Sequence, residues 1–348
     1  MTRIFVAGLG AVSPAGWTVA AMREALELGK SLPAQALVDL PVSSTGLMAR
    51  LVPAPPTRPE FLSHPRLRRT SPITHYAASA ALEAMAGIQP ARLENTRVGL
   101  IVCVQSGCVQ YSCRFYDEAL KNPATASPLL FPETVHAAPA SHIAVLVKNI
   151  TLVTSQVGDP SCFLLAMAQG AQWLDEKRVD FCLVIGAEEP NWITADALRL
   201  FDRTTCISAG AGAICLSREP DPSFGVELTA ITDAHTYSFV KGRGRAALAM
   251  RNQLNDHSDN KEADLLCDGL GNSPQVDRAE LAAWRDWPGA RLSPACILGQ
   301  GLMAGAAWQC VAACDALAKR RFKTAKVSLV GFNQQAIGAE FQANDTSR

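Results

Sequence analysis

Short runs of apolar residues recur along this chain, and stretches with helical character separate them. The runs have the length and composition of strands that are buried on both faces: Ile4 to Ala7, Val98 to Val104, Phe181 to Gly186 and Val327 to Val330. Helices are expected between them at 18–28, 70–85, 134–146, 162–177, 278–284 and 302–320. Because a strand that is apolar on both faces must be covered on both, this alternation predicts a layered α/β fold.

The remaining segments complete the expected order of elements. Further strands are expected at 151–155, 225–232 and 265–267. The triplet Gly8-Leu9-Gly10 is expected to form a tight turn directly after the first strand. The stretch 29–65, rich in Pro, Ser and Leu, and the stretch 255–261 are expected to be loops.

Size and charge limit the classes of function. The chain of 348 residues is 48% hydrophobic and 18% charged, so it can bury a sizeable core as one large domain or as two fused halves. Its 32 basic residues balance 32 acidic ones, and its basic clusters are short: Arg66-Leu67-Arg68-Arg69 and Lys319-Arg320-Arg321. This pattern argues against nucleic acid and against an anionic membrane as the main partner.

The cysteines indicate what chemistry the chain can support, and the N-terminus and the length of the apolar runs indicate where it is located. Many of the eleven cysteines lie inside apolar runs, which predicts buried reduced thiols, and no CxxC pair indicates zinc or redox chemistry. We therefore expect no metal and no cofactor. The first strand begins within four residues without the features of a signal peptide, and no apolar run approaches the roughly eighteen residues that span a bilayer. A cytoplasmic protein without membrane insertion is expected.

Several segments resemble, in order, the type II β-ketoacyl-ACP synthases. The segment Gly8 to Gly16 resembles their opening, and four later matches follow at 66–85, 126–132, 179–188 and 201–213. The resemblance implies a thiolase-like fold with αβαβα layers and two similar halves. Residues 1–220 would form the half with the nucleophile elbow, and residues 221–348 the half with the histidine and lysine positions.

The resemblance implies that the positions of the family's catalytic residues hold other residue types in this chain. The nucleophilic cysteine falls on Pro160, or on Ser161 if the turn slips by one residue. The first histidine falls on Gly269, the lysine on Ala295 and the second histidine on Gln300. Glutamine can donate a hydrogen bond, but it cannot carry a proton near neutral pH as histidine does.

The loop that gates the pocket in the family is also altered. Gly331, Phe332 and Asn333 stand where the family has a Gly-Phe-Gly-Gly-Thr-Asn loop, whose phenylalanine gates the pocket and whose backbone helps to form the oxyanion hole. The loss of the two glycines after Phe332 removes the backbone freedom on which that geometry depends.

Other possible nucleophiles and bases lie near or away from these positions. Cys162 begins a helix, where the macrodipole is expected to lower a thiol pKa, so Cys162 is the outside candidate for a nucleophile. No general base is placed to activate Ser161. The six histidines lie away from the matched motifs and are expected to be structural or solvated: His64, His75, His136, His142, His235 and His257.

An inactive homologue with an intact core resembles the chain length factor of type II polyketide or aryl polyene synthases. That resemblance implies a heterodimer with an active ketosynthase, a tunnel for a growing acyl chain near the interface, and contact with acyl carrier protein through the complex. The residues implied for the tunnel and interface are Ser106, Cys108, Gln110, Tyr111, Cys113, Phe115 and Tyr116. The bulky side chains of Tyr111, Phe115 and Tyr116 either set the length of the chain or are ordinary core or interface aromatics.

Two other classes of function stay open at this point. One is a self-sufficient acyltransferase, thioesterase or decarboxylase that uses Cys162 or Ser161. The other is a non-enzymatic binder of acyl carrier protein or lipid that works without a ketosynthase partner.

Overall fold

One long hydrogen-bonded sheet of eleven strands runs through the protein, in the order β12-β11-β13-β14-β9-β1-β8-β6-β4-β5, with β10 paired to β14 off this path. The computed structural model describes residues 2–37, 46–200, 202–221, 224–238, 240–255, 264–332 and 334–344. The strands are β1 (Ile4–Val12), β4 (Val98–Val104), β5 (Ile150–Val157), β6 (Phe181–Glu188), β8 (Gly210–Ser217), β9 (Val226–Ile231), β10 (His235–Thr236), β11 (Asp264–Cys267), β12 (Ala290–Leu292), β13 (Thr324–Val330) and β14 (Gln335–Ala343).

Ten of the sheet's eleven described strands form two five-stranded halves with the same topology, and β10 lies outside both. In the first half β5, β4 and β6 are parallel neighbours, and β8 and then β1 follow antiparallel. In the second half β12, β11 and β13 are parallel neighbours, and β14 and then β9 follow antiparallel. Each half thus places its third, second, fourth, fifth and first strands side by side. The two first strands, β1 and β9, pair with each other and join the halves.

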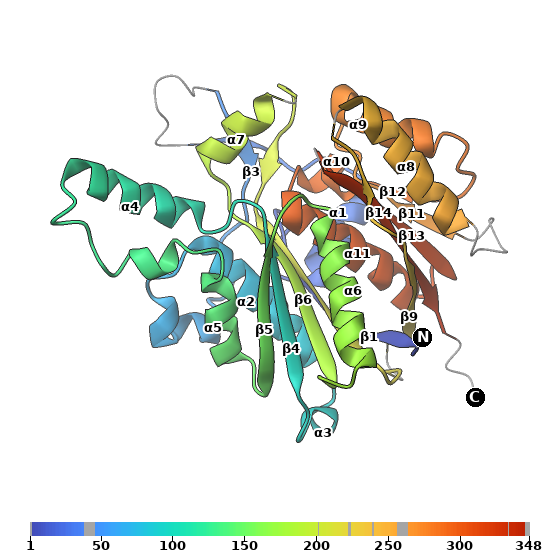
Figure 1. Ribbon diagram of the computed structural model, residues 1–348, viewed down its shortest axis with the longest axis horizontal. Coiled ribbons are helices and arrows are strands. Elements are labelled where there is room, and N and C mark those ends of the chain that lie inside the picture. Colours follow the sequence, from blue (N-terminus) through green and yellow to red (C-terminus); the bar gives the residue numbers. More distant parts are fainter. Residues whose placement is uncertain are drawn as a thin grey trace.

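Helices cover both halves and fill the space between them (Figure 1). Helices α2 (Pro72–Ala86) and α5 (Ala138–Leu146) pack on the outer face of the first half, and α8 (Val240–Asn255) and α9 (Pro274–Ala283) on that of the second. Helices α6 (Cys162–Asp175) and α11 (Leu302–Ala318) form the middle layer, where α11 contacts strands of both halves. These are the five αβαβα layers expected from the resemblance. The domain boundary at residue 220 stays a prediction.

The burial of the strands explains why their sequences are apolar throughout. Along β4, the side chains of Leu100 and Val102 belong to the core under α2 and α5. Those of Ile101 and Cys103 belong to the core that contains α6 and α11. Because both faces are covered, the alternation of polar and apolar residues that marks a half-exposed strand is absent from this run.

The remaining elements are short or lie at the margins of the layers. They are α1 (Val19–Leu28), α3 (Pro90–Leu93), α4 (Val109–Lys121), α7 (Trp192–Arg199) and α10 (Pro294–Leu298), with a small sheet of β2 (Gln35–Ala36), β3 (Met48–Arg50) and β7 (Ile207–Ser208). The loop expected at 255–261 falls outside the described residues except for Asn255, the last residue of α8. None of the helices within the described ranges is long and apolar enough to cross a bilayer.

The expected turn at Gly8-Leu9-Gly10 is wrong, because β1 continues through it to Val12. The glycines are needed for packing rather than for turning. A Cβ atom on Gly10 would lie 1.9 Å from the carbonyl oxygen of Ala80, and one on Gly8 would lie 2.0 Å from that of Ala84. The backbone of α2 therefore rests directly on the backbone of β1.

This close contact predicts the effect of a single methyl group. Gly10→Ala should lower the free energy of unfolding by about 1–3 kcal/mol, because α2 must move away from β1. Gly244→Ala is the matched control: a Cβ on Gly244 in α8 meets no atom within 4 Å, and Ala is the better helix former by about 1 kcal/mol. Urea unfolding of both variants measures the difference, and equal midpoints would contradict the packing described here.

Candidate functional site

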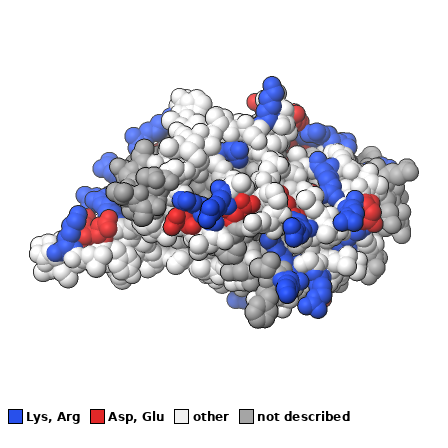
Figure 2. Space-filling view, turned by 90° about the horizontal axis from the view of Figure 1, so that it is seen from above, with Lys and Arg blue, Asp and Glu red and all other residues white. Residues whose placement is uncertain are grey.

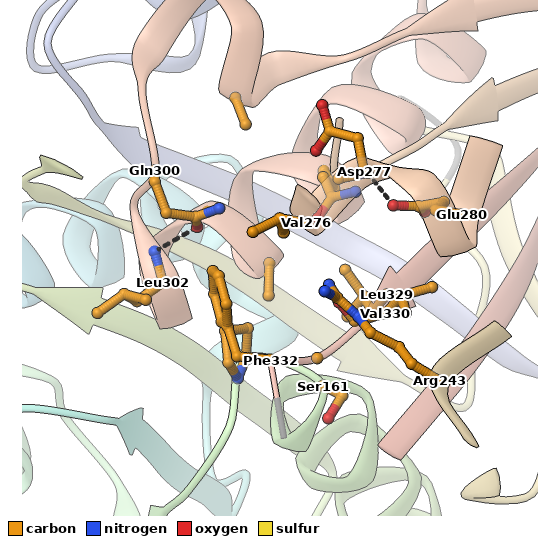
Figure 3. A pocket seen from close by; sticks show the side chains of 17 residues that line it. Ser161, Arg243, Val276, Asp277, Glu280, Gln300, Leu302, Leu329, Val330 and Phe332 are labelled. Carbon is orange, nitrogen blue, oxygen red and sulfur yellow. Dashed lines mark hydrogen bonds between the residues drawn. The ribbon is translucent and has the colours of Figure 1, made fainter. Parts of the chain in front are cut away.

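The residues matched to the ketosynthase chemical positions line one pocket at the start of α6 and α11 (Figure 3). The free volume of this pocket is about 40 Å³, which is room for about three water molecules. Seven of its lining residues were expected at this site from the sequence: Pro160, Ser161, Gly269, Ala295, Gln300, Gly331 and Phe332. Asn333, the third residue of the expected gate loop, lies outside the described residues.

The elbow between β5 and α6 offers a buried hydroxyl beside a carboxylate. Ser161 is completely buried, and its hydroxyl donates to Oδ1 of Asp159 at 3.3 Å. The backbone of Gly331 packs against the same carboxylate, since a Cβ on Gly331 would lie 2.0 Å from Oδ1. None of the histidines in the described ranges lines the pocket, so Ser161 has no imidazole base there.

Cys162 is placed differently from the expectation. It is the first residue of α6, but it is not among the residues that line the pocket. Burial raises the pKa of its thiol, and the neighbouring carboxylate of Asp159 raises it further. The expectation of a lowered pKa at this helix start is therefore wrong, because desolvation and a nearby negative charge outweigh the helix dipole. At neutral pH the group is a thiol, which is a poor nucleophile.

A buried acid occupies the space beside the position of the first histidine. The backbone N–H of Gly269 donates to Oε2 of Glu280 at 3.2 Å, and the Ser328 hydroxyl donates to Oε1. A Cβ on Gly269 would lie only 3.2 Å from Oε2. Burial raises the pKa of Glu280 to about 8, so this side chain is mostly protonated at neutral pH.

Two further acids hold the loop 268–273 that carries Gly269. Asp268 accepts from the Ser293 hydroxyl at 2.5 Å and pairs with Arg291 at 3.2 Å. Asp277 accepts the backbone N–H groups of Gly271 and Ser273, the latter at 2.9 Å. These carboxylates satisfy backbone donors of the loop and so fix its course.

On the opposite wall Gln300 is used as a helix cap. Its side-chain oxygen accepts from the backbone N–H of Leu302 at 3.0 Å, at the first residue of α11. Leu302 has a φ of 48° and is buried, so a bulky side chain is held in the left-handed region at the edge of the pocket. Ala295, in α10, contributes only a methyl group where the resemblance expects an amine.

Arg243 in α8 is a pocket residue that sequence reasoning missed. It is 8% exposed, its Nη2 donates to the carbonyl of Val330 at 3.1 Å, and its guanidinium carbon lies 5.9 Å from the ring centre of Phe332. Its sequence context, Lys241-Gly242-Arg243-Gly244-Arg245, is typical of a solvated basic turn. Nothing in that pattern separates the buried arginine from its exposed neighbours.

The residues expected at the tunnel and interface lie elsewhere, on an arm that projects from the body of the molecule (Figure 1). We define the arm as α4 with the segment 122–135. No residue of α4 is buried. Its exposed apolar side chains include Tyr116 (64%) and Leu120 (83%) on α4, and Leu129, Phe131 and Val135 beyond it. Phe115 packs on Phe131 with ring centres 5.5 Å apart.

The seven expected tunnel residues are divided between the base of the arm and its surface. Cys108 is buried at the base, and the Ser106 hydroxyl accepts from the hydroxyl of Thr194 at 3.1 Å. Gln110, Tyr111, Cys113 and Phe115 are partly exposed, and Tyr116 is exposed. None of the seven lines the pocket.

Two adjacent buried acids attach the arm to the sheet. Glu189 accepts from the backbone N–H of Gln110 at 2.7 Å and from the Ser71 hydroxyl at 2.5 Å. Glu188 accepts from the backbone N–H of Gln105 at 2.5 Å, and burial raises its pKa to about 8. The start of α4 is therefore held by carboxyl groups at the end of β6.

The described histidines have structural partners or lie away from the pocket. His142 contacts Glu133 at 2.9 Å, His75 contacts the carbonyl of Leu67 at 3.1 Å, and His235 contacts Gln253 at 3.0 Å. His257 falls outside the described residues. Within the part of the chain that the structure describes, no cluster of three or more His, Cys, Asp or Glu side chains is arranged to hold a metal ion.

The protonated state of Glu280 predicts how stability depends on pH. Its pKa of about 8 in the folded chain lies above the ordinary value of 4.5, so its contribution is complete at low pH and is lost as the pH rises toward 8. From about pH 5 to 8 the wild type should lose stability relative to Glu280→Gln, by up to about 1.4 kcal/mol per pH unit. Urea unfolding midpoints measured across this pH range test the prediction, with the exposed Glu24→Gln variant as control. If the midpoints of wild type and Glu280→Gln change in parallel with pH, the prediction is refuted.

Comparison with known proteins agrees with this geometry. The family model for the N-terminal domain of β-ketoacyl synthases matches residues 1–222. No curated protein sequence matches the chain. A β-ketoacyl synthase from Burkholderia phymatum is similar with a TM-score of 0.79 at 15% identity, over 99% of this chain and 100% of that one.

Two further solved structures are similar over nearly the whole chain. The ishigamide ketosynthase/chain length factor gives a TM-score of 0.78 at 18% identity, over 99% and 100% of the two chains. The complex of the ketosynthase ApeO with its chain length factor ApeC, from Xenorhabdus doucetiae, gives 0.77 at 14% identity, over 98% of each. Since the family model spans more than half of its residues, the chain belongs to the β-ketoacyl synthase family.

Proposed function

We propose that this chain is a non-catalytic, chain-length-factor-like subunit that pairs with an active β-ketoacyl-ACP synthase and shapes its acyl tunnel. The observation that carries the proposal is the content of the pocket. Where condensation requires a thiolate, two imidazoles and an amine, the chain presents Pro160, Gly269, Ala295 and Gln300 in a space of about 40 Å³. The reaction would be elongation of a polyketide, aryl polyene or fatty-acid-like chain.

The pocket also argues against a self-sufficient acyltransferase, thioesterase or decarboxylase. Ser161 is buried against a carboxylate, and the thiol of Cys162 has a raised pKa and is not among the groups that line the pocket. A covalent mechanism needs a nucleophile that an adjacent base or a lowered pKa activates. Neither candidate has such activation.

The arm supports a protein partner. Its apolar side chains are exposed in the single chain, although an apolar surface of this kind is normally covered in a complex. Figure 2 shows the arm as the projecting end of the molecule, where uncharged surface lies beside a few charged side chains. We propose that an active ketosynthase subunit covers it, as in a heterodimer.

Strand β5 supports the same arrangement because it ends the sheet. Its only strand neighbour among the described elements is β4, so its other edge is free to form hydrogen bonds. The strand has eight residues, contains neither a charge nor a proline, and exposes Val153 and Val157. An edge without these protective features pairs readily with another strand.

Acyl carrier protein would reach this chain through the complex. A solved complex of a type II ketosynthase with its carrier protein is similar to this chain, with a TM-score of 0.74 at 14% identity. On the face shown in Figure 2, basic side chains predominate over acidic ones, although the chain as a whole has 32 of each. Such a face is suited to a partner that carries negative charge.

Co-expression with a ketosynthase that has the Cys-His-His set tests the partner role. We expect a one-to-one complex and elongation from malonyl-loaded carrier protein only when both chains are present. Leu120→Lys on the arm, where the side chain is 83% exposed, should weaken the complex at least tenfold, whereas Leu28→Lys, 73% exposed on α1, should not. Turnover by this chain alone, or a stable homodimer that ignores the ketosynthase, would overturn the proposal.

The arm aromatics are expected to set product length. In a complex that covers the arm, Tyr111, Phe115 and Tyr116 would meet the growing chain near the interface. Replacing Phe115 and Tyr116 with alanine should shift the products of the pair to longer chains, because the bulky stops are removed. Mass spectrometry of carrier-bound products measures the shift; an unchanged length distribution from an intact complex would show that these rings only pack the interface.

A further inference from the structure

Arg243 is a buried cation that forms no direct ion pair with any acid in the described ranges. Only 8% of the residue is exposed, and its Nε has no hydrogen-bond partner. Its one hydrogen bond is from Nη2 to the carbonyl of Val330, and no ion pair joins it to an acid in the described ranges. Burying a guanidinium group away from water and from any anion costs free energy.

The acids that share the pocket do not meet this need. Asp277 accepts the backbone N–H groups of Gly271 and Ser273, and it makes no ion pair with Arg243. Glu280 accepts from the N–H of Gly269 and from the Ser328 hydroxyl, and its raised pKa keeps it largely uncharged near neutral pH. Arg243 interacts electrostatically with the carboxyl groups of Asp277 and Glu280, but among the described residues it has no direct ion pair with an acid.

The geometry around Arg243 suits a planar anion. In Figure 3 the guanidinium group reaches the middle of the pocket beside Phe332 and Val330, and Gln300 extends toward the same space from another wall. The Gln300 oxygen is used by Leu302, which leaves the amide N–H groups as donors toward the cavity. The guanidinium fork matches the two oxygens of a carboxylate.

We propose that this pocket is a binding site for a small carboxylate, held by the guanidinium group of Arg243 and assisted by the side-chain amide of Gln300. A free volume of about 40 Å³ limits the ligand to a few non-hydrogen atoms, such as formate or acetate. Binding requires only this chain, so the carboxylate site can be tested separately from the proposed role as a partner subunit of a ketosynthase.

A second cavity adjoins the pocket on the side of the small sheet. It has a volume of about 100 Å³ and includes Arg50 and Thr204 in its lining. It shares four lining residues with the pocket: Val276, Asp277, Ala295 and Gln300. Arg50 adds a positive charge to this second cavity, and Asp277 adds a carboxyl group to the wall that the two cavities share.

Carboxylate-dependent stabilisation tests the site. The thermal midpoint of the wild type should rise saturably with sodium acetate or formate at constant ionic strength, relative to sodium chloride, as expected for a ligand of the folded state. Arg243→Met should abolish this rise. Arg245→Met, which removes the same charge from an exposed position on the same helix, should keep it.

Line broadening of ¹³C-labelled acetate gives a second readout that needs no variant. The signal should broaden with wild-type protein and sharpen when unlabelled formate is added. Arg243→Lys, which keeps the charge but loses the fork, should weaken binding roughly tenfold. No saturable broadening by the wild type, equal displacement by chloride, or full binding by Arg243→Met would each overturn the proposal.

Discussion

Helix α11 lies between the two half-sheets, and the rest of the structure depends on how closely it fits there. A Cβ on Gly186 would lie 2.5 Å from the carbonyl oxygen of Met303, and one on Gly212 would lie 2.7 Å from the Cβ of Ala307. The indole N–H of Trp308 donates to main-chain oxygens of β1 and β8 at 3.1 and 3.0 Å. Side chains larger than these would separate the layers, so the helix start, and with it the pocket, is fixed by packing.

This arrangement explains how catalytic groups can be absent while the fold is kept. The loop 268–273 is held by Asp268 and Asp277, and Glu280 fills the space beside Gly269. Each of these acids satisfies backbone or hydroxyl donors, so the loop does not depend on an imidazole for its course. The course of this loop therefore does not require the family's catalytic groups, which is consistent with the proposed non-catalytic role.

The sequence predicted the layers because strands buried on both faces and long Ala-rich helices are unambiguous over eight to seventeen residues. It failed where the deciding contact is distant. The glycines of β1 resemble a turn until α2 is placed against them, and Cys162 resembles an activated thiol until the burial of its side chain in the folded layers is known. Arg243 was missed because burial of a charged residue leaves no local pattern.

The two ends of the sheet differ in a way that bears on the size of any assembly. At one end β5 offers eight uncharged residues along a free edge. At the other end β12 has only three residues, and its central Arg291 carries a charge. Short, charged edges resist pairing. Pairing through sheet edges could therefore add one partner, at β5, so this route of association favours a closed pair over a filament.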